Sequence, residues 1–268
     1  MLQSITSAQN PKIKDFLALQ EKSRLRREKG LFVVEGRREL LHCLEAGFSP
    51  RTIFVCEEIL GAGEMEAVLG AAGEGCTVFS VSANVYDRMA YRSGTEGVTA
   101  IMQARNLRLE ELRFRNEEPL IVVVEAVEKP GNLGAILRSA DAAGADAVIV
   151  CDPLTDLYNP NLIRASIGAV FSVPVVAASS AETIEWLRSR GVTIYTAQLQ
   201  DSSWYYDCDM KKATAIVMGT EATGLTGIWR EAADRHIRIP MLGKLDSLNV
   251  SVSAAVLLFE AVRQRNSK

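Results

Sequence analysis

Polar side chains gather just before a long apolar segment near the end of the chain. Ser247, Asn249 and Ser251 occupy alternate positions at the start of the apolar run 250–262. Such a run predicts a buried helix, and the first turn of a helix presents backbone N–H groups that lack a partner within the helix. Hydroxyl and amide groups there can hold a polar ligand, although serine and asparagine also serve as structural N-caps. Because similar residues recur where other predicted strands end, we favour a ligand site.

A second group of candidates follows the predicted strand 214–218, in the segment Gly219-Thr220-Glu221. A glycine lets the main chain approach a ligand closely. Glu221 could accept hydrogen bonds from a ligand, or it could simply stabilise the N-terminus of a helix. The residue types leave both interpretations open.

A third group follows the predicted strand 120–127 and consists of Asn132 and Arg138. An arginine in an alanine-rich helix needs an anion or carbonyl groups around its guanidinium. A structural ion pair with Asp141, three residues further on, is an equal alternative.

Basic residues cluster within the eight residues 22–29, where the only opposing charge is Glu28. The run predicts either a solvated helix face or a surface that contacts the phosphates of RNA. Its members are Lys22, Arg24, Arg26, Arg27 and Lys29.

The overall composition is that of a globular protein, with 268 residues, 48% hydrophobic residues and a formal net charge of −3. No apolar run approaches the length of about 20 residues that spans a bilayer, and the first residues do not resemble a signal peptide. Five cysteines without a paired spacing and only two histidines argue against a metal site. We therefore expect a cytoplasmic protein that holds no metal and does not associate with membranes.

Predicted helices and strands alternate along the whole chain, which indicates an α/β fold. The first series predicts a small α/β/α domain over 1–105, followed by a charged linker over 106–118. The second series predicts a mostly parallel sheet over 119–268, whose buried strands are continuous apolar runs. Ligands bind such sheets beyond the carboxyl ends of the strands. The expected elements are helices at 9–27, 37–46, 63–71, 83–91, 133–143, 161–170, 181–190, 225–233 and 249–265, and strands at 31–34, 52–57, 76–81, 97–103, 120–127, 147–151, 173–177, 192–198, 214–218 and 236–241.

Taken together, the three candidate groups resemble the three motifs of the SpoU/TrmH group of SPOUT RNA 2′-O-ribose methyltransferases, in order and in spacing. The resemblance covers roughly 120–265. The matching residues are Asn132 with Arg138, then Gly219-Thr220-Glu221, then Ile239-Pro240-Met241 with Ser247-Leu248-Asn249-Val250-Ser251. The segment Phe32-Val33-Val34-Glu35-Gly36 also resembles the ribosomal-protein-like substrate-binding domain that precedes the catalytic domain in many members.

This resemblance implies a SPOUT-type fold with a C-terminal trefoil knot, S-adenosylmethionine bound in the knot, and a homodimer. By position, the adenosine would contact the backbone near Gly219, Ile239 and Leu248, with Met241 and Ser251 in the same cofactor-binding set. The functional side chains implied are Asn132, Arg138, Glu221, Ser247 and Asn249.

The reaction implied by the resemblance is attack of a ribose 2′-oxygen on the methyl group of a sulfonium. The family proposal casts the arginine at position 138 as the base, yet a guanidinium loses its proton only above about pH 12. We therefore expect Arg138 to clamp a phosphate and favour ionisation of the hydroxyl. Two positions depart from the family pattern: Ala222 stands where glycine is common, and Lys129-Pro130-Gly131 replaces a turn that commonly contains Asp or Asn.

The resemblance implies methylation of structured RNA. Members that act on ribosomal RNA often have a leading domain of this type, so the resemblance favours ribosomal RNA of the large subunit, whose backbone the basic segment in that domain could grip. Alternatives are a tRNA 2′-O-methyltransferase and a non-catalytic RNA-binding ribosome-assembly factor on the same scaffold. A nicotinamide-dependent oxidoreductase is disfavoured because only Gly131 and Gly134 remain of the glycine fingerprint.

Overall fold

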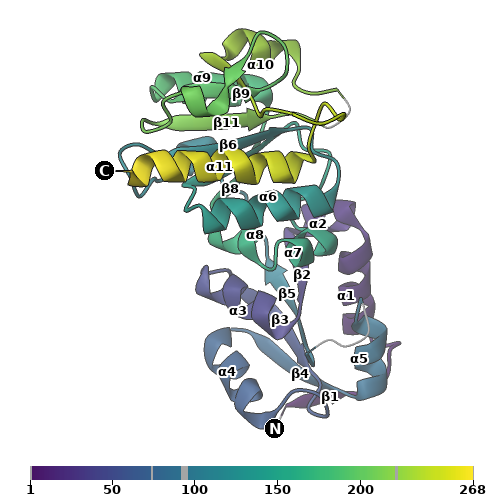
Figure 1. The fold of residues 1–268 in the computed structure, drawn as a ribbon. Coiled ribbons are helices and arrows are strands. Elements are labelled where there is room, and N and C mark those ends of the chain that lie inside the picture. The colour runs from purple at the N-terminus through teal and green to yellow at the C-terminus, as the bar shows by residue number, and fades with distance from the viewer. Residues whose placement is uncertain (1, 74, 92–95, 221–222, 268) are drawn as a thin grey trace. The chain divides into compact units, whose positions relative to one another are not determined.

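The computed structural model describes residues 2–73, 75–91, 96–220 and 223–267, and its contacts divide the chain into two compact units (Figure 1). The N-terminal unit comprises Met1–Arg105 and Asp156–Ser172, and the C-terminal unit comprises Asn106–Thr155 and Val173–Lys268. The segment 156–172 therefore contacts the N-terminal unit, although it lies within the sequence range expected for the second domain. The domain boundaries at 105 and 119 remain a prediction.

The N-terminal unit contains a five-stranded mixed sheet in the order β1-β4-β3-β5-β2. The strands β1, β4 and β3 are parallel, whereas β5 runs antiparallel to both β3 and β2. The strands are β1 (Gln3–Ile5), β2 (Leu31–Glu35), β3 (Pro50–Val55), β4 (Thr77–Val81) and β5 (Val98–Gln103). The helices of this unit are α1 (Pro11–Glu21), α2 (Ser23–Lys29), α3 (Arg37–Glu45), α4 (Ala62–Ala72), α5 (Ala83–Met89), α7 (Pro160–Ala165) and α8 (Ala169–Ser172).

The segment 156–172 packs into the aromatic part of this unit. The fully buried ring of Phe32 stacks on Tyr158, with ring centroids 4.2 Å apart, and lies 5.8 Å from Phe171. Phe48 meets Phe171 edge-on at 5.3 Å. Burial raises the pKa of Tyr158 to about 12, and its hydroxyl donates to the carbonyl of Arg105. Large aromatic side chains dominate the stability of small cores, so 156–172 completes the core of the N-terminal unit.

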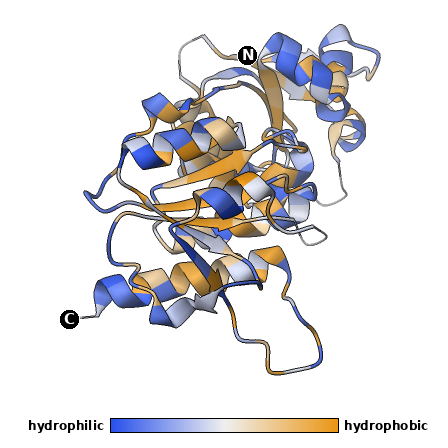
Figure 2. Ribbon diagram, turned by 90° about the horizontal axis from the view of Figure 1, so that it is seen from above, coloured by the Kyte–Doolittle hydropathy of each residue, from blue (hydrophilic) through white to orange (hydrophobic). Residues whose placement is uncertain are grey.

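The C-terminal unit contains a seven-stranded sheet in the order β10-β12-β9-β11-β6-β7-β8, in which all paired strands are parallel. The central strands are fully buried, and Figure 2 shows the hydrophobic colour concentrated on the strands. Helices α6 and α11 lie side by side on one face, and α9 and α10 cover the other face (Figure 1). The strands are β6 (Leu120–Glu125), β7 (Ala147–Cys151), β8 (Val175–Ala178), β9 (Thr193–Ala197), β10 (Ser203–Trp204), β11 (Thr214–Met218) and β12 (Arg235–Arg238). The helices are α6 (Pro130–Ala142), α9 (Ser180–Ser189), α10 (Gly227–Ala232) and α11 (Val250–Asn266). Two short 3-10 turns complete the unit, η1 (Leu109–Glu111) and η2 (Tyr205–Asp207).

The prediction of an α/β fold with a mostly parallel sheet is confirmed, and the predicted elements differ from the structure in a few places. The helix expected over 9–27 is interrupted because Lys22 adopts an extended conformation between α1 and α2. The helix expected over 161–170 splits at Ile167, whose φ of 53° is left-handed. The short strands β1 and β10 were not predicted.

Candidate active site

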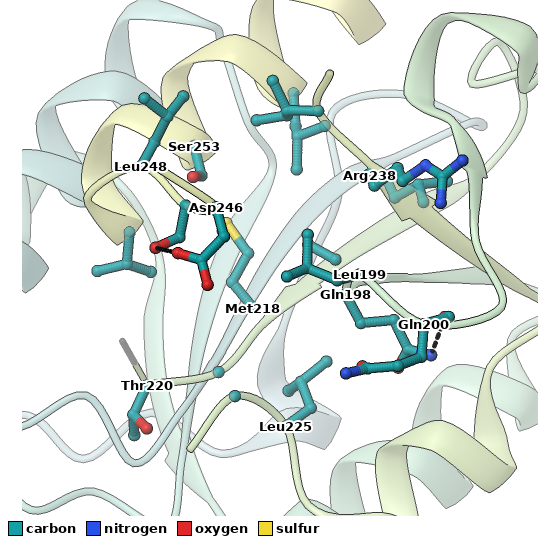
Figure 3. A pocket seen from close by; sticks show the side chains of 18 of the residues that line it. Gln198, Leu199, Gln200, Met218, Thr220, Leu225, Arg238, Asp246, Leu248 and Ser253 are labelled. Carbon is teal, nitrogen blue, oxygen red and sulfur yellow. Dashed lines mark hydrogen bonds between the residues drawn. The ribbon is translucent and has the colours of Figure 1, made fainter. Parts of the chain in front are cut away.

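A cavity of about 360 Å³ opens at the carboxyl ends of β9, β11 and β12 in the C-terminal unit (Figure 3). The last residues of these strands, Ala197, Met218 and Arg238, all line it. This is the edge at which parallel sheets bind ligands. Of the residues predicted for a cofactor or for catalysis, it brings together Gly219, Ile239, Met241, Ser247 and Leu248.

The wall at the end of β11 is main chain folded tightly on itself. The N–H of Gly224 donates to the carbonyl of Thr220 at 3.0 Å, and the two residues form an isolated β-bridge. A Cβ on Gly219 would lie 2.2 Å from the carbonyl carbon and oxygen of Gly224. Only glycine fits here, because the obstacle is backbone and cannot move aside. Glu221 and Ala222 lie outside the described residues, so the role predicted for Glu221 remains a prediction.

The opposite wall comes from the segment before α11 and from α11 itself. Leu248 and Ser253 face the cavity from this side, and Met218 faces it from the end of β11 (Figure 3). Ser247 Oγ donates to Asp246 Oδ1 at 3.2 Å, so a carboxylate and a hydroxyl form one polar corner beside the apolar Leu248. A combination of apolar surface with placed polar groups is typical of small-molecule sites.

The third wall, directly after β9, was missed by sequence reasoning. Gln198, Leu199 and Gln200 line the cavity, and Gln198 Nε2 donates to the carbonyl of Gln200 at 2.9 Å (Figure 3). Gln198 Oε1 and Arg238 Nε are buried and have no hydrogen-bond partner among the described residues. Buried polar atoms without partners are rare and call for an explanation such as an absent ligand or water. The cavity wall is therefore consistent with a surface completed by a polar ligand.

Asn249 joins the third motif to the first. Its Oδ1 accepts hydrogen bonds from Ser251 N at 3.0 Å and from Ser251 Oγ at 2.6 Å, which caps α11. Its Nδ2 donates to Asn132 Oδ1 at 3.2 Å, in the first turn of α6. Asn249 is therefore the N-cap of α11 and also contacts the first turn of α6, while its predicted catalytic role remains a prediction. Asn132, Asn249 and Ser251 lie beside the cavity and are not among its lining residues.

Arg138 lies on α6, six residues beyond Asn132. Its side chain is exposed and forms no hydrogen bond or ion pair with the described residues. The alternative of a structural ion pair with Asp141 is thus not realised. An exposed guanidinium that is not committed to the protein can bind an anion from outside.

A match to a family model decides what kind of protein presents this arrangement. The model described as the SpoU rRNA Methylase family matches residues 119–259, more than half of the chain. The chain belongs to the SpoU rRNA methylase family. The model described as the MRM3-like substrate binding domain matches residues 10–100.

Two relatives match this SpoU methylase along nearly the whole chain. It is 28% identical over 258 residues to the 23S rRNA (guanosine(2553)-2'-O)-methyltransferase RlmP of Bacillus subtilis, covering 96% of this chain and 98% of the relative. It is 30% identical over 272 residues to the 23S rRNA (uridine(2479)-2'-O)-methyltransferase of Streptomyces viridochromogenes, covering 97% and 92%.

Two solved structures of RNA methyltransferases match over nearly the whole chain. An AdoMet-bound rRNA methyltransferase from Sinorhizobium meliloti matches with a TM-score of 0.91 and 31% identity, covering 99% of each chain. A crystal structure of an RNA 2'-O ribose methyltransferase matches with a TM-score of 0.83 and 40% identity, covering 98% of this chain and 99% of the other.

The basic segment of this SpoU methylase requires one correction. Arg26 is only 4% exposed, and its guanidinium binds Asp156 at 2.7 Å and the carbonyls of Leu19 and Gln20. A side chain with these partners holds α2 to the segment 156–172 and is not available to phosphates, so the prediction that Arg26 contacts RNA is wrong. The other four residues of the set are exposed: Lys22, Arg24, Arg27 and Lys29.

Within the described residues, no helix could cross a bilayer, and no cluster of acidic, cysteine or histidine side chains could hold a metal ion. Burial raises the pKa of Cys151 to about 12, and it raises the pKa of Cys43 still further. Thiols that stay protonated are poor nucleophiles, so these two cysteines are core residues.

Proposed function

We propose that this protein transfers a methyl group from S-adenosylmethionine to a ribose 2′-oxygen in ribosomal RNA of the large subunit. The observation that carries the proposal is the hydrogen bond between Asn249 and Asn132, which links the lip of the sheet-edge cavity to the helix bearing the uncommitted guanidinium of Arg138. Membership of the SpoU rRNA methylase family and the 23S rRNA relatives support the substrate.

The cavity has the size and lining that the cofactor requires. Its volume of about 360 Å³ falls within the range of small-molecule sites. The apolar side chains of Leu199, Ile239 and Leu248 would cover the adenosine, and the backbone around Gly219 would supply hydrogen bonds. When bound, the cofactor supplies an electrophilic methyl group on a sulfonium. We also propose that the segment between β12 and α11 forms the trefoil knot of the SPOUT fold.

Arg138 is proposed to act as a cation that positions the RNA. A guanidinium remains protonated at neutral pH, so it can bind a phosphate next to the target ribose and stabilise the charge that develops on the 2′-oxygen. Asn249 caps α11, and its hydrogen bond to Asn132 ties this helix to the first turn of α6, so the two residues hold the helices that frame this step. Ser247 and Glu221 are proposed to complete the polar side of the site.

The active form is proposed to be a homodimer that packs through α6 and α11. On α11, Val252 and Phe259 are seven residues apart, lie on one helix face, and are 47% and 48% exposed. On α6, small residues lie on the helix face of Arg138, seven and three residues before it and four residues after it, at Gly131, Ala135 and Ala142. Adjoining apolar and small-residue faces suit a close contact between two copies, which would bring Arg138 of one protomer near the cavity of its partner.

The exposed basic residues of α2 and its start are proposed to grip the RNA backbone. Lys22, Arg24, Arg27 and Lys29 can neutralise phosphates without reading sequence. The same proposal includes a cytoplasmic location. It also includes the expected domain organisation, with domains at 1–105 and 119–268 joined by the linker 106–118.

A methyl-transfer assay with a matched arginine variant tests the proposal. Purified protein is incubated with methyl-labelled S-adenosylmethionine and large-subunit ribosomal RNA, and 2′-O-methylation is scored by resistance of the modified linkage to alkali. Wild type is expected to transfer label, and Arg138→Lys to lower the rate about 100-fold with an unchanged dissociation constant for the cofactor by calorimetry. Methyl transfer to tRNA but not to ribosomal RNA would show that the substrate is tRNA. RNA binding without methyl transfer to any RNA would favour the assembly-factor alternative.

A further inference from the structure

A second cavity, of about 200 Å³, lies entirely within the N-terminal unit and has no part in the methyl-transfer site. It is formed by the start of α3, the residue Tyr91 beyond α5, and α7. The helix α7 belongs to the segment 156–172, so the cavity unites residues that are far apart in the sequence. Three of its lining residues carry the argument: Glu39, Tyr91 and Arg164.

Glu39 provides a nearly buried carboxylate. Its side chain is 9% exposed, and its Oε1 accepts a hydrogen bond from Arg38 at 2.9 Å. Its Oε2 accepts no hydrogen bond from the described residues and lies 2.7 Å from the place that a Cβ on Gly36 would occupy. Glycine at position 36, whose φ is +98°, therefore leaves room for this oxygen.

A capping role does not account for Glu39. It lies at the third position of α3, where a glutamate often accepts from the N–H of the N-cap residue. Here the N–H of Gly36 donates instead to the carbonyl of Val98 at 3.2 Å. The next carboxylate along the cavity, Glu96, takes over the helix terminus and accepts from Arg37 N at 2.6 Å. Glu39 lines the cavity, and its Oε2 thus retains an acceptor site.

Tyr91 provides an exposed aromatic face held in a fixed position. Its ring is part of a side chain that is 46% exposed, and the guanidinium of Arg164 lies 5.2 Å from the ring centroid. Asn161 Nδ2 donates to Tyr91 Oη at 3.3 Å, and the Tyr91 N–H donates to the carboxylate of Glu35 at 3.1 Å. An aromatic ring beside an arginine is a stacking surface for an unpaired base of RNA.

We propose that this cavity binds one unpaired guanine of the RNA substrate, stacked on Tyr91 and Arg164 with its donor edge on Glu39. A carboxylate oxygen needs an N–H donor, and guanine is the base whose Watson–Crick edge carries two adjacent donors, N1–H and the N2 amine. Adenine and cytosine place a ring acceptor beside their amine, which a carboxylate repels. The choice of RNA as the ligand rests on the proposed function, whereas the choice of base rests on the cavity.

Equilibrium binding of short RNA tests this inference without any turnover. The probes are fluorescein-labelled uridine hexamers that carry guanosine, inosine or adenosine at one central position, titrated with the full-length protein at constant salt. Wild type is expected to bind the guanosine probe about tenfold more tightly than the adenosine probe, with inosine between them because it lacks the N2 amine. Glu39→Gln should abolish the difference, and Tyr91→Ala should weaken binding of all three probes several-fold.

The control variant is Glu64→Gln, which removes an exposed carboxylate of the same unit that pairs with Arg37 at 3.0 Å. It should keep the guanosine preference. If Glu39→Gln melts below wild type, Tyr91→Ala decides, because the exposed ring can be removed without opening the core. Equal binding of the guanosine and adenosine probes by wild type, a preference that survives Glu39→Gln, or unchanged binding by Tyr91→Ala would each overturn the inference. Calorimetry with S-adenosylmethionine on the same variants should give wild-type affinity, so a failure of this inference is distinguishable from a failure of the methyltransferase proposal.

Discussion

The sheet-edge cavity and the cavity of the N-terminal unit use glycine for opposite purposes. In the C-terminal unit, Gly219 is required because main chain meets main chain, with the carbonyl of Gly224 only 2.2 Å from a hypothetical Cβ. In the N-terminal unit, Gly36 leaves room for a side chain, the carboxylate of Glu39. The first cavity therefore presents main chain beside apolar and polar side chains, which recognise a ligand by its shape and by hydrogen bonds. The second presents charged groups, which recognise a ligand by its hydrogen-bonding edge.

The comparison extends to how each site is assembled from the sequence. The walls of the C-terminal cavity come from loops that each follow a strand of one parallel sheet and from the start of α11. The N-terminal cavity instead needs α7, which reaches it from the segment between β7 and β8. The C-terminal site is thus local to one sheet edge, and the N-terminal site depends on a segment that the chain supplies later.

The largest expected effect concerns the wall of the C-terminal cavity where the main chain of Gly219 packs against that of Gly224, here called the backbone cradle. Gly219→Ala should weaken binding of S-adenosylmethionine more than about 100-fold, because the added Cβ collides with backbone that cannot yield. Isothermal titration calorimetry measures the loss. Gly227→Ala is the matched control, since a Cβ at Gly227 meets nothing within 4 Å. Equal affinity for Gly219→Ala and wild type would show that the cradle is not the cofactor site.

The next effect concerns the segment that completes the N-terminal unit. Asp156→Asn should lower the free energy of unfolding by about 3 kcal/mol, because it leaves the buried guanidinium of Arg26 without its counter-ion. Glu28→Gln, which breaks the exposed pair with Arg24, should cost less than about 1 kcal/mol. Urea unfolding measures both. Similar small losses for the two variants would mean that 156–172 does not stabilise this unit.

A smaller effect separates the two roles of Asn249. Asn249→Ala should cost about 1 kcal/mol of stability through the lost N-cap and should also lower the methyl-transfer rate about tenfold. Asn249→Ser keeps a capping oxygen but cannot reach Asn132, so it should regain stability without regaining rate. Thermal melting and single-turnover kinetics report the two quantities. If Asn249→Ser also regained the methyl-transfer rate, the only role of Asn249 would be to cap α11.

The smallest effect is expected at the cysteines. Cys43 and Cys151 are buried, and burial raises the pKa of both thiols, so in the folded protein they should resist alkylation at pH 8. Cys76, which is partly exposed, should react first and leave cofactor affinity unchanged. Mass spectrometry of tryptic peptides after timed exposure to iodoacetamide orders the sites. Rapid modification of Cys151 would contradict the buried core of the C-terminal unit.

More of the C-terminal unit than of the N-terminal unit could be predicted from the sequence. Strands β7 and β11 match their predicted bounds because strands buried on both faces are continuous apolar runs. The resemblance to the SpoU/TrmH motifs assigns Gly219, Ile239 and Leu248 to one site, and all three line the cavity at the edge where the parallel strands end. Gln198 and Gln200 could not be assigned to it, since polar residues after a strand are equally typical of any loop.

The features that could not be predicted depend mostly on contacts between residues far apart in the sequence. A run of basic residues does not reveal that Arg26 turns inward, because its partner Asp156 is 130 residues away. The break of the first helix at Lys22 is likewise invisible to periodicity, since the residues on both sides favour a helix. Glu39 reads as an ordinary residue of a first helical turn until the cavity beside it is seen.

The most direct test of the central claim is to map ribose methylation on large-subunit ribosomal RNA after incubation with S-adenosylmethionine and either wild type or Arg138→Lys. We predict one new 2′-O-methylated nucleotide with wild type and about 100-fold less of it with the variant, while calorimetry shows equal cofactor affinity for both. A methyl group that appears on a base, or equal ribose methylation by the two proteins, would contradict the account.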